Sequence, residues 1–107
     1  MKEKYRRLIC ADGFSMSVQA DSGAYCEPRN NEGPYSEVEV GYPSVAEELL
    51  LPWAENPGIP TKTVYAYVPS EVVLEVVLKH GGFVDGTMPK MEMGLSNHYP
   101  PISCENR

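Results

Sequence analysis

Three cysteines and two histidines are the side chains of this chain that could ligate zinc or act as a nucleophile and its base. They are Cys10, Cys26, Cys104, His80 and His98. Structural zinc sites usually pair their ligands at C-x-x-C or H-x3-H spacing, and no such pair occurs here. A Cys/His catalytic pair also lacks a local motif, since Glu27 beside Cys26 does not favour its thiolate. The sequence therefore predicts no metal, no cofactor, no catalytic residues and no enzymatic activity.

Two pairs of glutamates could supply acid–base chemistry, namely Glu37 with Glu39 and Glu71 with Glu75. Both pairs lie on faces expected to be exposed, so a wetted surface is a better interpretation than an acid–base pair. Glu37 and Glu39 instead predict a small acidic ridge on the outward face of a strand. No phosphate-binding glycine loop and no nucleophile elbow accompanies them.

Aromatic and loop residues favour protein binding over chemistry. Tyr65 and Tyr67 share one face of a predicted strand with Trp53 nearby in sequence, so they either form a contact patch or cover the sheet. Tyr25 and Arg29 lie in a long loop, where Arg29 either pairs internally or anchors an interface. The candidate partner-binding residues are Tyr25, Arg29, Glu37, Glu39, Trp53, Tyr65 and Tyr67.

The elements that must position these side chains centre on residues 61–82. Residues 63–68 alternate between two sets of side chains, which is the period of a strand. Pro69-Ser70 then predicts a helix start, and the valine- and leucine-rich run that follows predicts a helix buried on most of its surface. Gly81-Gly82 predicts its left-handed end.

The rest of the chain adds three strands and a short helix. Residues 4–11 and 14–20 form a predicted hairpin around Asp12-Gly13, and residues 35–42 form a third strand. Ser44 and Glu47 make a capping box that predicts a short helix before Pro52. Phe83 and Val84 could add a short edge strand.

The fold class that follows is α+β, with the element order β-β-β-α-β-α. A four-stranded, mainly antiparallel sheet carries one long buried helix on one face and a short second helix. Residues 1–86 are expected to form one domain, and residues 87–107 a flexible tail.

Composition limits the partners. The chain has 107 residues and a net charge of −6, which argues against binding phosphates or an anionic membrane and permits a basic partner. No apolar leader or membrane span is visible, and three cysteines at irregular spacing make no disulfide framework. A reducing cytoplasm is the expected location.

Three strings carry a resemblance to known proteins. DGFSMSVQA, YCEPRNNEGPYSEVEVGYPS and TVYAYVPSEVVLEVVLKHGG resemble a group of small proteins encoded by bacteriophages and prophages, over about residues 12–82. Small acidic phage proteins of this kind often look like inhibitors of host defence, with anti-CRISPR proteins foremost. The resemblance implies a non-enzymatic interaction protein of the bacterial host cytoplasm, and it transfers no binding residues.

The expected function is inhibition of a bacterial defence complex. An acidic, aromatic surface would cover the basic nucleic-acid channel of a partner such as a CRISPR–Cas effector subunit, without direct contact to nucleic acid or membrane. The alternative is a phage structural or replication accessory protein. Such a protein would act by self-association, as a homodimer for example, or by binding another phage protein.

Overall fold

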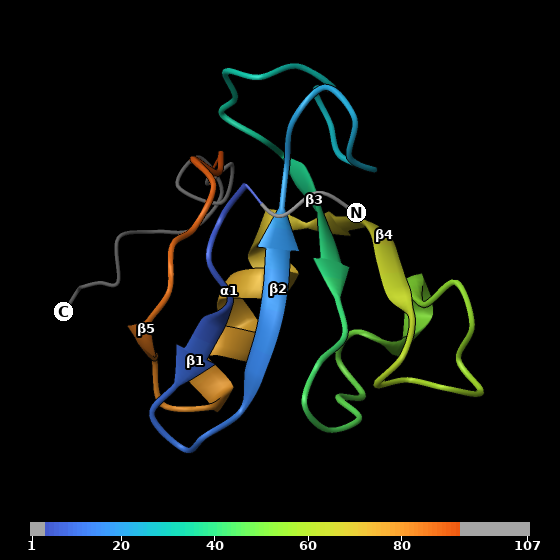
Figure 1. Ribbon diagram of the computed structural model, residues 1–107, viewed down its shortest axis with the longest axis vertical. Coiled ribbons are helices and arrows are strands. Elements are labelled where there is room, and N and C mark those ends of the chain that lie inside the picture. The colour runs from blue at the N-terminus through green and yellow to red at the C-terminus, as the bar shows by residue number, and fades with distance from the viewer. Residues whose placement is uncertain (1–3, 93–107) are drawn as a thin grey trace, which may run out of the picture.

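The computed structural model describes residues 4–92. Its elements are β1 (Leu8–Cys10), β2 (Ser15–Gln19), β3 (Glu37–Gly41), the 3-10 helix η1 (Leu51–Trp53), β4 (Val64–Pro69), α1 (Ser70–Lys79) and β5 (Phe83–Asp85). The strands form one sheet in the order β4-β3-β2-β1-β5, and all neighbouring strands are antiparallel (Figure 1). The α+β class is confirmed, although the sheet has five strands where four were predicted.

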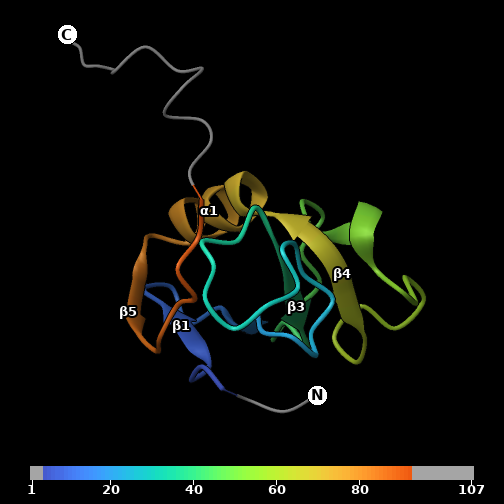
Figure 2. The same ribbon diagram turned by 90° about the horizontal axis from the view of Figure 1, so that it is seen from above.

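The core lies between one face of the sheet and α1 (Figure 2). Alternation in β2 and β3 places Met16, Val18, Val38 and Val40 on that face, and all four are fully buried. From α1, the buried residues are Ser70, Val73, Val76 and Val77. The helix therefore buries one stripe rather than most of its surface as predicted, and Leu78 is 66% exposed.

The predicted hairpin is present, and local chemistry explains it. β1 and β2 pair through Leu8 with Met16, and the turn between them contains Asp12 and Gly13. Asp12 accepts a hydrogen bond from the Phe14 N–H at 2.9 Å, and Gly13 has a φ of +96°, where a side chain would be strained. Gly81 likewise has a φ of +89° just after α1, as expected of a helix end.

The prediction of a short helix after Pro43 is wrong. Residues 44–50 form bends and turns, and only the single turn η1 follows. The two side chains of the expected capping box bind elsewhere. The Ser44 hydroxyl accepts a hydrogen bond from the Ser15 N–H at 2.9 Å, and the Glu47 carboxylate binds Lys79 and His80 of another segment. Tertiary contacts therefore replace the local cap.

β4 does not alternate along its whole length. Val40 lies opposite Tyr65 and Val38 lies opposite Val68, so β4 holds one more residue than β3 between these pairs. This is a β-bulge, and Tyr67 within it has a φ of +55°. The extra residue reverses the alternation, so Tyr65 points into the core and Tyr67 does not.

β5 forms the other edge of the sheet, and the residues after it run to the segment just before β3. β5 pairs with β1, and the chain then returns along residues 87–92. The Tyr35 N–H donates to the Lys90 carbonyl at 2.8 Å, and the Glu92 N–H donates to the Tyr35 carbonyl at 2.7 Å. This part of the predicted tail therefore packs against the domain. Residues 93–107 of the predicted tail lie outside the described residues.

Within residues 4–92, the model contains no helix with both the length and the apolar character required to cross a membrane.

Candidate binding cleft

The face of the sheet opposite α1 is polar and largely covered. Residues that lie opposite each other in neighbouring strands share a face of the sheet. Gln19 lies opposite Glu39, and Gly41 lies opposite both Ser17 and Val64, so the side chains of this face come from Ser17, Gln19, Glu39 and Val64. Ser17, Gln19 and Glu39 are all buried. The Gln19 side-chain carbonyl accepts the N–H groups of Lys4 and Tyr5 at 2.8 and 3.0 Å, so the start of the described chain lies across this face.

The long loop at residues 21–34 docks onto the same face through Tyr25. The Tyr25 N–H donates to Oε1 of Glu39 at 2.8 Å, and the Tyr25 carbonyl accepts the Tyr67 N–H at 3.1 Å. One residue of the loop is thus fixed to both β3 and β4. Loops of this length are usually either functional or disordered, and in the structure this loop lies over the sheet as one wall of a cleft.

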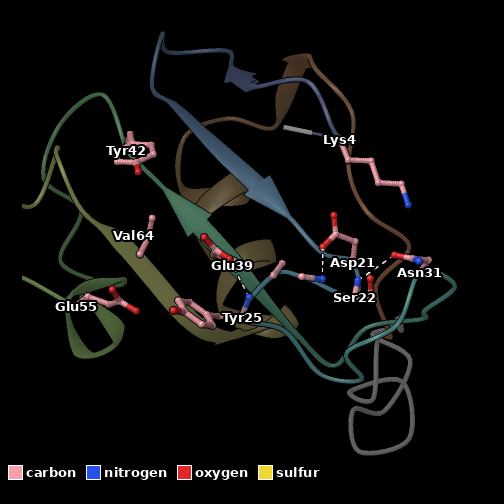
Figure 3. Close-up of a pocket in the computed structure, with 11 residues that line it drawn as sticks. Lys4, Asp21, Ser22, Tyr25, Asn31, Glu39, Tyr42, Glu55 and Val64 are labelled. Carbon is pink, nitrogen blue, oxygen red and sulfur yellow. Dashed lines mark hydrogen bonds between the residues drawn. The ribbon is translucent and has the colours of Figure 1, made fainter. Parts of the chain in front are cut away.

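An open cleft of about 950 Å³ lies between this loop, the sheet and the segments beside it (Figure 3). Within the described part of the chain, its lining combines three carboxylates, one lysine and two tyrosine rings with an asparagine and with small and apolar residues. The lining residues that matter here are Asp21, Glu39, Glu55, Lys4, Tyr25, Tyr42 and Val64. The carboxylates outnumber the lysine, so the cleft favours a cationic ligand.

Three of the predicted binding residues meet at the edge of this loop. The Arg29 guanidinium donates to the Tyr67 hydroxyl at 2.7 Å and lies 5.6 Å from the centroid of the Tyr25 ring. The two tyrosine rings are 6.0 Å apart, and they are 42% and 40% exposed. Arg29 therefore pairs internally, through a cation–π contact that leaves an aromatic surface in solvent.

The other predicted binding residues do not form the surfaces expected of them. The prediction of an acidic ridge is wrong, because the 21–34 loop covers β3. Glu39 is only 6% exposed, and Glu37 is half-buried. The aromatic patch of Tyr65, Tyr67 and Trp53 is also wrong. Tyr65 is fully buried in the core, and its hydroxyl donates to the Pro60 carbonyl at 2.6 Å, while Trp53 packs partly buried against the core.

Tyr42 is a cleft residue that sequence reasoning missed. Its φ is +52°, so within residues 4–92 it and Tyr67 are the two residues other than glycine with a left-handed backbone. Such a conformation costs on the order of 1–3 kcal/mol and persists only where the surroundings hold it. Here the Tyr42 N–H donates to the Thr63 carbonyl at 3.1 Å, and the Tyr42 carbonyl accepts from Arg7 at 2.6 Å.

A second polar cluster surrounds His80, just after the last residue of α1. Its Nδ1 lies 2.6 Å from Asp12, its Nε2 lies 2.7 Å from Glu47, and its ring stacks on Phe14 at 4.1 Å. Glu47 is 2% exposed and also accepts the Lys79 ammonium at 2.8 Å. Both imidazole nitrogens are bound to carboxylates, so His80 has no free nitrogen to act as a base on a substrate. The cluster joins the hairpin turn, the 44–50 segment and the end of α1.

The pKa values within this cluster are displaced in opposite directions. Burial works against the charge of His80, but its hydrogen bonds to Glu47 and Asp12 prevail and raise its pKa above the ordinary value of 6.5. Burial likewise opposes ionisation of Glu47, yet hydrogen bonds from Lys79 and His80 lower its pKa below 4.5. The pKa of Asp12 is lowered below 3.8, first by the Phe14 N–H and then by His80.

Stability is expected to be greatest between about pH 4.5 and 6.5, because of these shifts. The contribution of His80 is complete below pH 6.5 and is lost as pH rises through its raised pKa. The contributions of Glu47 and Asp12 are complete above pH 4.5 and are lost as pH falls. Thermal unfolding midpoints measured from about pH 4 to 8.5 test this. His80→Gln should remove the alkaline decline, and an unchanged decline in that variant would refute the assignment.

Metal ligands do not converge in the described part of the chain. Among residues 4–92, no three His, Cys, Asp or Glu side chains are placed to hold one ion. Cys10 and Cys26 are buried free thiols, and burial raises the pKa of both. Cys104 and His98 lie outside the described residues.

The fold and the cleft together define a small α+β protein with an acidic, tyrosine-lined cleft on the sheet face away from its helix. Comparison of the chain with protein-family models, with curated protein sequences and with solved structures gives no match.

Proposed function

We propose that this protein is a non-enzymatic inhibitor that binds a basic surface of a bacterial defence complex. The observation that carries the proposal is the cleft, where Asp21, Glu39 and Glu55 outnumber Lys4 in a chain of net charge −6. A surface of this sign attracts the basic channels in which such complexes hold nucleic acid. The resemblance to small phage proteins favours an anti-CRISPR inhibitor of a Cas effector.

The tyrosines around the cleft support protein binding rather than a purely electrostatic role. Tyr25, Tyr42 and Tyr67 are each about two-fifths exposed, at 42%, 41% and 40%. Tyrosine provides a large contact area at a small entropic cost and is enriched among the residues that dominate binding energy. Tyr42 and Tyr67 are also held in unfavourable backbone conformations, and strain of this kind is concentrated at functional sites.

The mechanism would be occlusion. The cleft and its tyrosines would cover basic residues of the partner, in the host cytoplasm, and nucleic acid could then no longer reach them. No chemical step is needed, which fits a histidine whose two nitrogens are already bound to carboxylates.

A pull-down with the tagged full chain tests the proposal. The bait is incubated with lysate from bacteria that carry an active CRISPR–Cas system, and recovered proteins are identified by mass spectrometry. Stoichiometric recovery of Cas subunits is expected, and recovery of the bait alone would refute the proposal.

A double variant, Tyr42→Gly with Glu55→Lys, tests which face binds. Glycine removes the ring and the backbone strain together, and Glu55 is exposed, so folding should be preserved. Binding to the recovered partner should weaken at least about tenfold. Glu75→Lys, an exposed charge reversal on α1 across the sheet, is the matched control and should bind normally. If the parent chain, the double variant and Glu75→Lys all bind the partner equally, the cleft face is excluded as the binding surface.

A second candidate function, a self-associating phage accessory protein, is favoured by the edge formed by β5. Phe83 and Val84 are 43% and 70% exposed, and no strand within residues 4–92 pairs with the outer side of β5. An open strand edge with apolar side chains can pair with a second copy. Gel filtration over a range of concentrations distinguishes the two functions. A dimer that Val84→Lys disrupts would favour this candidate, and a monomer throughout would exclude it.

A further inference from the structure

We infer that the cleft is a recognition site for a guanidinium group, namely an arginine side chain carried by an extended segment of the partner. That a partner exists rests on the proposed function, whereas the chemical class of the ligand follows from the cleft alone.

Glu39 is the residue whose carboxylate points most directly to a cationic ligand. It lies in the cleft wall (Figure 3) and is only 6% exposed. Its Oε1 accepts the Tyr25 N–H at 2.8 Å, and no donor within residues 4–92 bonds its other carboxylate oxygen. A buried carboxylate with an open acceptor is costly, and a cationic donor in the cleft would satisfy it.

The surrounding charges act in the same direction. Glu55 is exposed at the rim, and Asp21, which uses one oxygen to accept the Gly23 N–H at 2.7 Å, lies in the loop wall. Among residues 4–92, Lys4 is the one basic side chain in the lining. A bound cation would therefore meet attraction from several sides, in a site that is partly shielded from solvent.

An inorganic cation fits this distribution poorly. A divalent metal requires several ligands that converge on one point, and no three such side chains converge within residues 4–92. The carboxylates are instead spread along a cleft of about 950 Å³, which is at the upper end of the volumes typical of small-molecule sites. That space suits an inserted side chain together with the peptide that carries it.

The tyrosines select a guanidinium over an ammonium. A guanidinium is planar, stacks on aromatic rings and offers several donors in a fixed fork, whereas an ammonium is a compact and strongly hydrated charge. The protein already contains one such contact at the edge of the cleft, made to the lining residue Tyr25 by an arginine that lies outside the lining. Arg29 lies 5.6 Å from the Tyr25 ring centroid while it donates to the Tyr67 hydroxyl. A ligand arginine could use Glu39 and Tyr42 in a similar way.

The experiment is an NMR titration of the 15N-labelled full chain with N-acetyl-arginine amide. Saturable shifts of the amides of Tyr25, Glu39, Tyr42 and Val64 are expected. The lysine analogue should bind more weakly, and the neutral isostere N-acetyl-citrulline amide should not bind. Equal binding of the citrulline analogue, shifts confined to other surfaces, or displacement of the arginine analogue by millimolar Ca²⁺ would each overturn the inference.

Glu39→Gln tests the central contact. The amide keeps one oxygen to accept the Tyr25 N–H, removes the charge and replaces the second oxygen by an NH2 donor, so affinity should fall about tenfold. Glu37→Gln makes the same change of charge on the same strand outside the cleft lining, and it should bind as the parent does. If thermal unfolding shows that Glu39→Gln is misfolded, Glu55→Gln at the exposed rim replaces it, with an expected loss of about threefold.

The two proposals can fail separately. Arginine binding in the cleft without recovery of any defence complex would leave this inference standing and refute the proposed function. If the chain recovers Cas subunits but does not bind N-acetyl-arginine amide, the proposed function stands and this inference is refuted.

Discussion

Replacing Gly86 with alanine is expected to destabilise the protein by about 3 kcal/mol, since its Cβ would collide with backbone. Gly86 has a φ of +103° and lies against β1, where an added Cβ would overlap the Arg7 carbonyl oxygen and come 2.7 Å from the Leu8 Cα. Backbone in a paired strand cannot move aside as a flexible side chain can. The edge strand β5 and residues 87–92 would have to separate from the sheet or distort it.

Gly13→Ala is the matched control, because Gly13 has a nearly equal φ of +96° and an added Cβ there would meet no atom within 4 Å. It should cost only the conformational penalty of about 1 kcal/mol. Urea unfolding gives both free energies, and hydrogen exchange should show increased exchange in β5 for Gly86→Ala alone. Equal destabilisation by the two variants would mean that backbone conformation, and not the close approach to β1, makes Gly86 necessary.

Glu47→Ala is the second substitution with a large expected effect, a loss of about 3 kcal/mol of unfolding free energy. Glu47 is 2% exposed, and its carboxylate accepts from Lys79, His80 and the Leu49 N–H. Alanine would leave the two cationic side chains and a backbone donor without this partner. It would also separate the 44–50 segment from the end of α1.

Glu48→Ala provides the comparison for Glu47→Ala. Glu48 is the next residue, carries the same charge and is exposed, so its removal should change stability by less than about 0.5 kcal/mol. Both free energies are measured by urea unfolding near pH 6, where His80 is charged. A cost for Glu47→Ala as small as that for Glu48→Ala would show that the network does not stabilise the fold.

Local sequence was sufficient wherever the backbone or a single periodicity decides the structure. Alternation placed Val38 and Val40 on the core face, and both are fully buried. The turn at Asp12 and Gly13 and the end of α1 at Gly81 follow from glycine at positive φ. These features depend on neighbouring residues only, so no tertiary information is needed to predict them.

Predictions failed where a distant segment competed for the same groups. Glu47 was expected to cap a helix, but a histidine and a lysine from the end of α1 bind its carboxylate instead. Glu39 was expected in solvent, but the 21–34 loop covers it and donates the Tyr25 N–H. Tyr65 was placed on the wrong face because one extra residue in β4 reverses the alternation, and a bulge leaves no mark in a hydrophobic pattern.

The sequence by itself determined the α+β class, the approximate positions of β1 to β4 and of α1, and the acidic charge, because composition and short-range periodicity encode them. Only the tertiary structure decided that a cleft exists and what lines it. Its carboxylates come from Asp21, Glu39 and Glu55, in three separate segments that the antiparallel sheet brings together. Contacts between residues so far apart in the chain depend on strand register and loop docking, which no local pattern specifies.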